Sequence, residues 1–453
     1  MRNIVLMCLF ALFSAVLALG QNRSVADSAI AKITKEITLP KIPENSVELH
    51  QFGALPNDAK DDRKAIIKAL NYLKKRDGGK LIIGYGIYDI NGPIHLPSHV
   101  NLHLQEGAVL RFAPKPELYL PMVFTSWEGT FLYNYSPLIY AKNETNIAIT
   151  GAGVIDGEGS KVWSTFKAEE QADKLLSRKM NHEEQPIANR QFGKDSKLRP
   201  HLLQFMDCKN ILIEDVHFED SPFWTTHFLR SNEITIRGIS FNAHNKNNDG
   251  IDLEYVNNVL IENVDFNNSD DNIAIKAGRD TEGRANSETP SQNIVIRNNR
   301  FKGLHALVIG SEMSAGVKNV FVVDNMASGY LKRGVYFKTN SDRGGYIKSI
   351  YIDQLELQKT EDCIYMTANY HGEGSGAHAS QLNDIFISNV TCEVATETAI
   401  VIEGYPTKKA HHIYLSDIHV KQATNGLTLT NTKNVHLNEV IIGKRAGTPT
   451  AVK

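Results

Sequence analysis

Cysteine is scarce in this sequence, which excludes a disulfide-rich scaffold. Four cysteines occur in 453 residues, and Cys8 lies in an apolar N-terminal segment. The other three, Cys208, Cys363 and Cys392, form neither a disulfide framework nor a zinc-binding pattern. We expect buried free thiols, with a Cys363–Cys392 bridge as the alternative.

The chain also lacks a surplus of charge of either sign. Its 49 Lys and Arg residues nearly balance its 51 Asp and Glu residues, for a formal net charge of -2. Proteins that bind phosphate groups of nucleic acids normally have an excess of Lys and Arg, so no nucleic-acid partner is expected. The same reasoning does not exclude a polyanionic sugar, which needs only a few local cations.

Long apolar runs are missing except at the N-terminus. There, residues 4–19 are mostly apolar and follow the positive Arg2. This run is shorter than the roughly 20 residues of a membrane-spanning helix. Ala18 and Gly20 are small residues at the positions that a signal peptidase reads. We therefore predict a signal peptide over residues 1–20, a secreted or periplasmic protein, and no membrane partner.

A repeated strand pattern is abundant instead. Each copy starts with a polar residue, most often Asn, and continues with alternating β-forming residues. The copies start at Asn146, Asn210, Glu233, Asn258, Asn293, Asn319, Ser349, Asp384, His412 and Asn434. Alternation indicates strands with one buried face, and a repeat of roughly 20–35 residues indicates stacked coils. A β-propeller would need blades of about 40–45 residues. We predict an all-β, right-handed parallel β-helix of about ten coils.

The first part of the mature chain has a different pattern. Residues 61–75 predict an amphipathic helix that ends before Gly78. We interpret residues 47–140 as a helical N-terminal cap with the first coils, and residues 141–445 as the coils that carry the site. Together they form one domain over residues 21–453. The polar segment 157–199 is predicted to be a long loop with one helical turn near 168–176.

Three polar motifs interrupt the repeat. They are Asn247-Asn248-Asp249-Gly250, Ser269-Asp270-Asp271-Asn272 and Gly303-Leu304-His305. Asp249 and Asp270 are about one coil apart, which places their carboxylates on neighbouring coils. Glycoside hydrolysis needs one carboxyl group as acid and another as base. The alternatives are ordinary Asn and Asp turn residues, or a calcium site.

In this order, the motifs resemble those of the polygalacturonase family of glycoside hydrolases, family 28. The resemblance covers residues 50–440 or so. Its Asn-x-Asp motif falls on Asn247 and Asp249, and its Asp-Asp pair on Asp270 and Asp271. The family's Gly-His-Gly, Arg-Ile-Lys and late tyrosine elements fall on His305, on Tyr336-Phe337-Lys338 and on Tyr370.

The resemblance implies an inverting hydrolase that acts on galacturonic acid in pectic polysaccharide, without a cofactor or metal. It implies that Asp270 is the general acid, that Asp249 and Asp271 hold the attacking water, and that His305 orients or tunes the acid. Lys338 would bind a sugar carboxylate, and Tyr370 would line the leaving-group side. Asn247 is a further candidate for substrate binding. We also expect a monomer.

One departure from the family bears on the substrate. Tyr336 stands where the family has arginine, and tyrosine cannot replace a bidentate cation. Arg279, Arg333 and Arg343 are candidates to compensate, and Tyr336 itself becomes a candidate for substrate binding. The favoured function is an exo-acting polygalacturonase, and a rhamnogalacturonan-directed galacturonohydrolase is the alternative. A calcium-dependent lyase or a non-catalytic carbohydrate-binding β-helix would belong to other functional classes.

Overall fold

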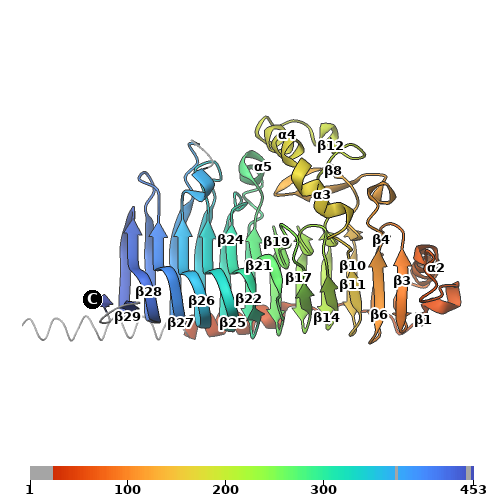
Figure 1. The fold of residues 1–453 in the computed structure, drawn as a ribbon, viewed down its shortest axis with the longest axis horizontal. Helices are drawn as coiled ribbons and strands as arrows, with labels where there is room; N and C mark the ends of the chain where they lie inside the picture. Colours follow the sequence, from red (N-terminus) through yellow and green to blue (C-terminus); the bar gives the residue numbers. More distant parts are fainter. Residues whose placement is uncertain (1–23, 373–375, 445–449, 453) are drawn as a thin grey trace, which may run out of the picture.

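The computed structural model describes residues 24–372, 376–444 and 450–452. The predicted signal peptide over residues 1–20 and Cys8 lie outside the described residues. Within the described residues the strands are stacked as parallel coils along the long axis of the molecule (Figure 1). The predicted parallel β-helix is therefore confirmed.

Each coil contributes strands to three stacks. The first stack contains β1 (Ser46–Glu48), β2 (Gly79–Ile83), β5 (Val100–Leu104), β10 (Thr145–Thr150), β14 (Lys209–Glu214), β17 (Asn232–Arg237), β20 (Asn257–Glu262) and β22 (Ser291–Arg297). The second contains β4 (Ile94–His95), β9 (Ile139–Lys142), β13 (Leu203–Met206), β16 (Thr226–Leu229), β19 (Ile251–Glu254), β21 (Asn268–Lys276) and β24 (Gly303–Gly310). The third contains β3 (Gly86–Ile90), β6 (Ala108–Phe112), β11 (Val154–Asp156), β15 (His217–Glu219) and β18 (Ser240–Asn242), and the short β23 (Arg300–Phe301) pairs with β25 (Val317–Lys338).

The later coils are single long strands, and all but the last of them bend through the three stacks. They are β25 (Val317–Lys338), β26 (Tyr346–Thr367), β27 (Gln381–Glu403), β28 (Ala410–Thr430) and β29 (Thr432–Lys444). At the C-terminal end, β30 (Thr450–Val452) pairs antiparallel with β29. One apolar core cluster runs inside the coils from Leu49 to Ile442.

The polar residue that starts each repeat has a backbone reason. Asn146, Asn210, Asn258, Asn293 and Asn319 all have φ between 53° and 57°. This left-handed conformation is more accessible to Asn than to most other residues, because its short polar side chain bonds locally. The repeat therefore marks the same bend in successive coils, and the apolar residues that follow point into the core.

Helices cover the N-terminal end and one side of the coils. The predicted cap helix is α2 (Arg63–Lys74), which buries Ile66, Leu70 and Leu73. A second helix over residues 24–36 was not predicted. It lies across the outside of the first stack, where Ala26 and Ile33 pack with an apolar cluster (red in Figure 1). The members of that cluster on the coils are Leu260, Val295 and Phe321.

The predicted long loop at 157–199 is wrong in part. This segment contains α3 (Val162–Glu169) and α4 (Gln171–His182), which project beside a hairpin of β7 (Val123–Trp127) and β8 (Thr130–Asn134) (Figure 1). Polar contacts hold α4 in place, since Leu175 and Leu176 are exposed. The remaining short elements are β12 (Gln191–Phe192), α5 (Asp280–Ala285), η1 (Leu49–Phe52), η2 (Pro116–Tyr119), η3 (Ile187–Asn189) and η4 (Tyr370–Gly372).

Two further predictions can be compared with the structure. Cys208, Cys363 and Cys392 are all free and buried, as expected. Across the residues that the structure describes, none of the helices combines the length and the apolar character needed to cross a membrane.

Candidate active site

The motif residues meet on the second stack of strands. Asp271 on β21 is in register with His305 on β24, and His305 is in register with Arg333 on β25. Asp249 comes just before β19, and the Gly250 N–H donates to the Asp271 carbonyl oxygen at 2.9 Å. Adjacent coils are about 4.8 Å apart, so each coil adds one functional side chain to a single groove.

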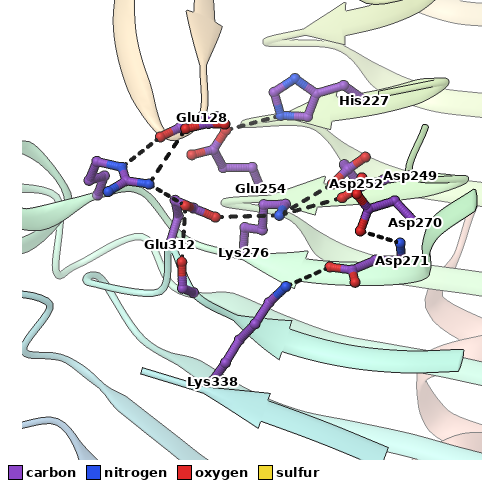
Figure 2. Close-up of polar contacts among 12 residues, drawn as sticks. Glu128, His227, Asp249, Asp252, Glu254, Asp270, Asp271, Lys276, Glu312 and Lys338 are labelled. Carbon is purple, nitrogen blue, oxygen red and sulfur yellow. Dashed lines mark hydrogen bonds and ion pairs between the residues drawn. The ribbon is translucent and has the colours of Figure 1, made fainter. Parts of the chain in front are cut away.

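Asp271 is the most strongly bound carboxylate of the site. His305 Nδ1 lies 2.6 Å from its Oδ1. Lys338 Nζ donates to its Oδ2 at 2.8 Å (Figure 2). Burial alone would raise the pKa of Asp271, but the Lys338 ammonium and His305 hold it well below its usual range. These contacts therefore favour the ionised form of Asp271.

Asp249 and Asp270 have the opposite tendency. Burial raises the pKa of Asp270, and the neighbouring Asp271 charge raises it further. Burial also raises the pKa of Asp249 well above its usual range, with added repulsion from Asp252 and Asp270. A cluster that separates ionised from protonated carboxyls in this way can supply both an acid and a base.

A buried lysine lies behind these acids. Lys276 Nζ is 3.9 Å from Asp249 Oδ2, 3.5 Å from Asp252 Oδ1 and 3.4 Å from Glu312 Oε2 (Figure 2). It also lies 4.3 Å from the centre of the Trp224 ring. The pKa of Lys276 is raised despite burial, because three carboxylates surround the ammonium. Lys276 therefore adds a permanent positive charge to the floor of the site.

These groups line a pocket of about 510 Å³. Among the described residues its Lys and Arg side chains outnumber its Asp and Glu side chains. The basic ones are Lys174, Arg178, Lys246, Lys276, Arg279, Lys332, Arg333 and Lys338. The acidic ones are Glu128, Asp249, Asp270, Asp271 and Glu312. A pocket that combines paired carboxyls with excess cations suits a sugar that itself carries a carboxylate.

The pocket is closed on one side by a wall formed by the tip of the β7–β8 hairpin and helix α4. Glu128 at the tip accepts ion pairs from Lys174 Nζ and Arg178 Nη2, each at 3.2 Å. Asn181 Nδ2 of α4 donates to Thr130 Oγ1 at 3.0 Å and so fixes the helix to the hairpin. Burial acts to raise the pKa of Glu128, but the surrounding cations lower it to about 2. The wall is therefore held together by charges that stay ionised.

Asp270, Asp271 and His305 also place potential metal ligands within 4.8 Å of one another. Their surroundings do not fit a cation, however. Both oxygens of Asp271 already bind His305 or the Lys338 ammonium, and Lys276 adds a second positive charge nearby. The donor set is thus better suited to proton transfer than to metal binding.

Comparison with known proteins identifies the family. Residues 124–441 match the model of glycosyl hydrolases family 28. The chain belongs to this family. The family is one of O-glycosyl hydrolases, and the lyase and the non-catalytic binding module are set aside.

Two sequence relatives and one solved structure show which proteins this family 28 member is similar to. A probable polygalacturonase of Vitis vinifera is 30% identical over 75% of this chain and 65% of that protein. An endo-polygalacturonase of Pectobacterium carotovorum subsp. carotovorum is 26% identical over 89% of this chain and 93% of that protein. The crystal structure of a hyperthermoactive exopolygalacturonase from Thermotoga maritima has a TM-score of 0.86 and 34% identity, and covers 91% of this chain and 96% of that one.

The structure brings together most of the predicted residues of this glycoside hydrolase. Asn247, Tyr336 and Tyr370 line the pocket with the three aspartates. His305 Nδ1 bonds to Asp271, with which it is in register, and potential ligand atoms of Asp270 and His305 lie within 4.8 Å of each other. That His305 orients or tunes Asp270 stays a prediction. Arg279 lines the pocket from the wall side, where its guanidinium binds Glu312.

Two sets of residues correct the sequence-based picture. Arg343, a candidate to compensate for Tyr336, is buried, binds Asp280 and is absent from the described pocket lining. Glu128, Asp252 and Glu312 were missed, because no motif joins them. Only folding brings Asp252 and Glu312 beside Lys276, and Glu128 beside Arg279. Lys276 itself follows the Asp-Asp pair on β21, a signal that could have identified it.

Proposed function

We propose that this enzyme hydrolyses α-glycosidic bonds of galacturonic acid in pectic polysaccharide, by exo-acting, inverting acid/base catalysis. The observation that carries the proposal is the placement of Asp249 and Asp270 beside Asp271, which binds His305 and Lys338, in a cationic pocket with one closed side. The substrate class follows from family membership and from the relatives named as polygalacturonases. The N-terminal sequence supports a secreted or periplasmic location.

The roles follow from the charge states. Asp270, with its raised pKa, is the general acid that protonates the leaving oxygen. Asp249 and Asp271 hold the attacking water, and the ionised Asp271 supplies the negative charge that accepts a proton. His305 positions Asp271 through Nδ1, while its Nε2 has no hydrogen-bond partner among the described residues and can meet the substrate. Lys338 links Asp271 to the sugar-binding surface.

Exo action is supported by the wall. A polymer that runs through the groove would have to pass Glu128 and its partners Lys174 and Arg178. Since both ion pairs are largely shielded from water, this closure is rigid rather than a loose surface contact. The Thermotoga maritima relative, whose fold and sequence are similar over most of the chain, is named as an exopolygalacturonase.

A substrate assay with EDTA present tests the proposal. We expect new reducing ends, no ultraviolet-absorbing product, and monomer as the first product released from homogalacturonan. NMR of the first product should show inverted anomeric configuration. Asp270→Asn should abolish turnover and leave the melting temperature within about 1 °C of wild type, because a shape-conserving change keeps the packing. Oligomers as first products would contradict exo action, and full activity of the variant would contradict the acid assignment.

Tyr336 favours a second candidate, a galacturonohydrolase directed at rhamnogalacturonan. It packs with Ala274 and Val308 in a small apolar cluster, with Tyr365 and Tyr370 beside it. An apolar floor of this kind can contact the methyl group and C–H face of a neutral deoxysugar. Activity on rhamnogalacturonan oligosaccharides alone would support this second candidate.

A further inference from the structure

In the family motif an arginine stands where this chain has Tyr336. Another residue must therefore bind the sugar on the leaving-group side. At position 336 this chain has tyrosine, whose ring is only 5% exposed. Lys338, the cation that the motif retains, is bound to Asp271 at 2.8 Å. A leaving sugar that carries a carboxylate therefore needs a second cation from elsewhere in the pocket.

Arg333 is the cation whose position fits this need. It is in register with His305, and through His305 with Asp271, so it lies two coils beyond the catalytic aspartate. Two coil spacings amount to about 10 Å. This is roughly the distance from a cleaved bond to the far side of the adjacent sugar, and Arg333 also lines the pocket.

The guanidinium of Arg333 is held in a fixed orientation. It lies 4.6 Å from the centre of the Tyr336 ring and 4.1 Å from that of Tyr365. On another side, its Nε is 3.3 Å from Asp362 Oδ2. Two rings and one carboxylate thus fix the plane of the guanidinium. A guanidinium that is already oriented loses little entropy when it binds a carboxylate.

The binding capacity of Arg333 is incompletely used. Although Asp362 is close, Arg333 Nε is buried without a well-aligned hydrogen bond to any described residue. Burial raises the pKa of Asp362, and Arg333 acts against that rise. Arginine stays charged under all these conditions, and the Nε without a hydrogen-bond partner shows that Asp362 does not use the full donor capacity of Arg333.

We propose that Arg333, stacked on Tyr336, is the specificity-determining residue that binds the carboxylate of the leaving-side sugar. In this arrangement tyrosine at 336 is the support on which a displaced arginine lies, and the leaving-side sugar is a uronate. The inference rests on the proposed hydrolysis of galacturonic acid linkages and adds to it the chemistry of the second sugar.

The test compares two substrates that differ in the leaving sugar. Digalacturonate offers a carboxylate there, and a galacturonosyl-(1→2)-rhamnose disaccharide does not. We expect Arg333→Gln to lower kcat/KM on digalacturonate about 10- to 150-fold, the usual range for losing a hydrogen bond between charged groups. On the rhamnose disaccharide the loss should stay below about threefold. Arg300→Gln is the matched control, because Arg300 is an exposed arginine outside the pocket, and should change neither value.

A second variant separates lost carboxylate binding from damage to the fold, because only a folded protein can regain activity. Adding Tyr336→Arg to Arg333→Gln restores a cation at the position of the family motif, and should recover at least tenfold on digalacturonate. Equal losses on both substrates, or no loss on digalacturonate, would overturn the proposal. Wild-type activity on the rhamnose disaccharide alone would also overturn it. Failure of the wild-type enzyme on both substrates would instead count against the proposed function.

Discussion

Replacing Glu254 with Gln should change how the stability of the protein depends on pH. Glu254 is fully buried beside the active site, where its Oε2 lies 3.0 Å from His227 Nε2 and accepts a bond from Ser126 Oγ at 3.3 Å. Burial, together with repulsion from Glu312, raises the pKa of Glu254 from 4.5 to about 7. Gln conserves the shape and one oxygen but cannot ionise.

The sign and size follow from proton linkage. Because the folded state holds the proton more tightly than the unfolded state, Glu254 favours folding below pH 4.5 or so, and this contribution is lost as pH rises to about 7. A difference of about 2.5 pKa units corresponds to roughly 3.4 kcal/mol. The free energy of unfolding of Glu254→Gln relative to wild type should therefore rise by about 3 kcal/mol between pH 4 and pH 8.

Thermal unfolding of both proteins at the two pH values measures this difference. Unfolding entropy for a chain of this size is roughly 0.9 kcal/mol/K, so the relative melting temperature should shift by about 4 °C. Any fixed cost of burying the amide cancels between the two pH values. Glu356→Gln, at an exposed position of β26, is the control and should show no such shift. A pH-independent difference for Glu254→Gln would refute the reasoning.

Three further outcomes are expected. Lys338→Met should raise the pKa of Asp271 by roughly 1–3 units and move the acidic limb of the kcat profile upward, and an unmoved limb would contradict the ion pair's role. The thiols of Cys208, Cys363 and Cys392 should react with Ellman's reagent only after denaturation. If only one thiol reacts in the denatured protein, Cys363 and Cys392 form a disulfide. Ile33→Ala should lower stability by about 2–4 kcal/mol without changing kcat, since Ile33 is buried far from the pocket in helix 24–36.

The sequence predicted the features that repeat from coil to coil. Asn210 and Asn258 mark the same left-handed bend, so the stacking of strands was visible in the spacing alone. The same regularity placed Asp271 and His305 on neighbouring coils. Periodicity of this kind carries information because each coil packs only on the next one.

The features that were missed depend on contacts between distant segments. Helix α4 has exposed leucines and is fixed by polar groups such as Asn181, so its hydrophobic pattern was weak. Glu128 enters the site from the tip of a hairpin that no motif identified. The hydrogen-bond partner of His305 is set by strand register, which pairs His305 with Asp271, and the motif alone did not give that register.

Helix 24–36 also bears on the order of events during folding. Its segment precedes the coils on which it docks, and the hydrogen bond from the Thr38 N–H to Glu233 joins residues 195 positions apart. The helix has no apolar surface to cover until the strands around Val295 and Phe321 have stacked. The helix can therefore dock only after the middle of the chain has folded. A docked helix indicates that the central coils have formed.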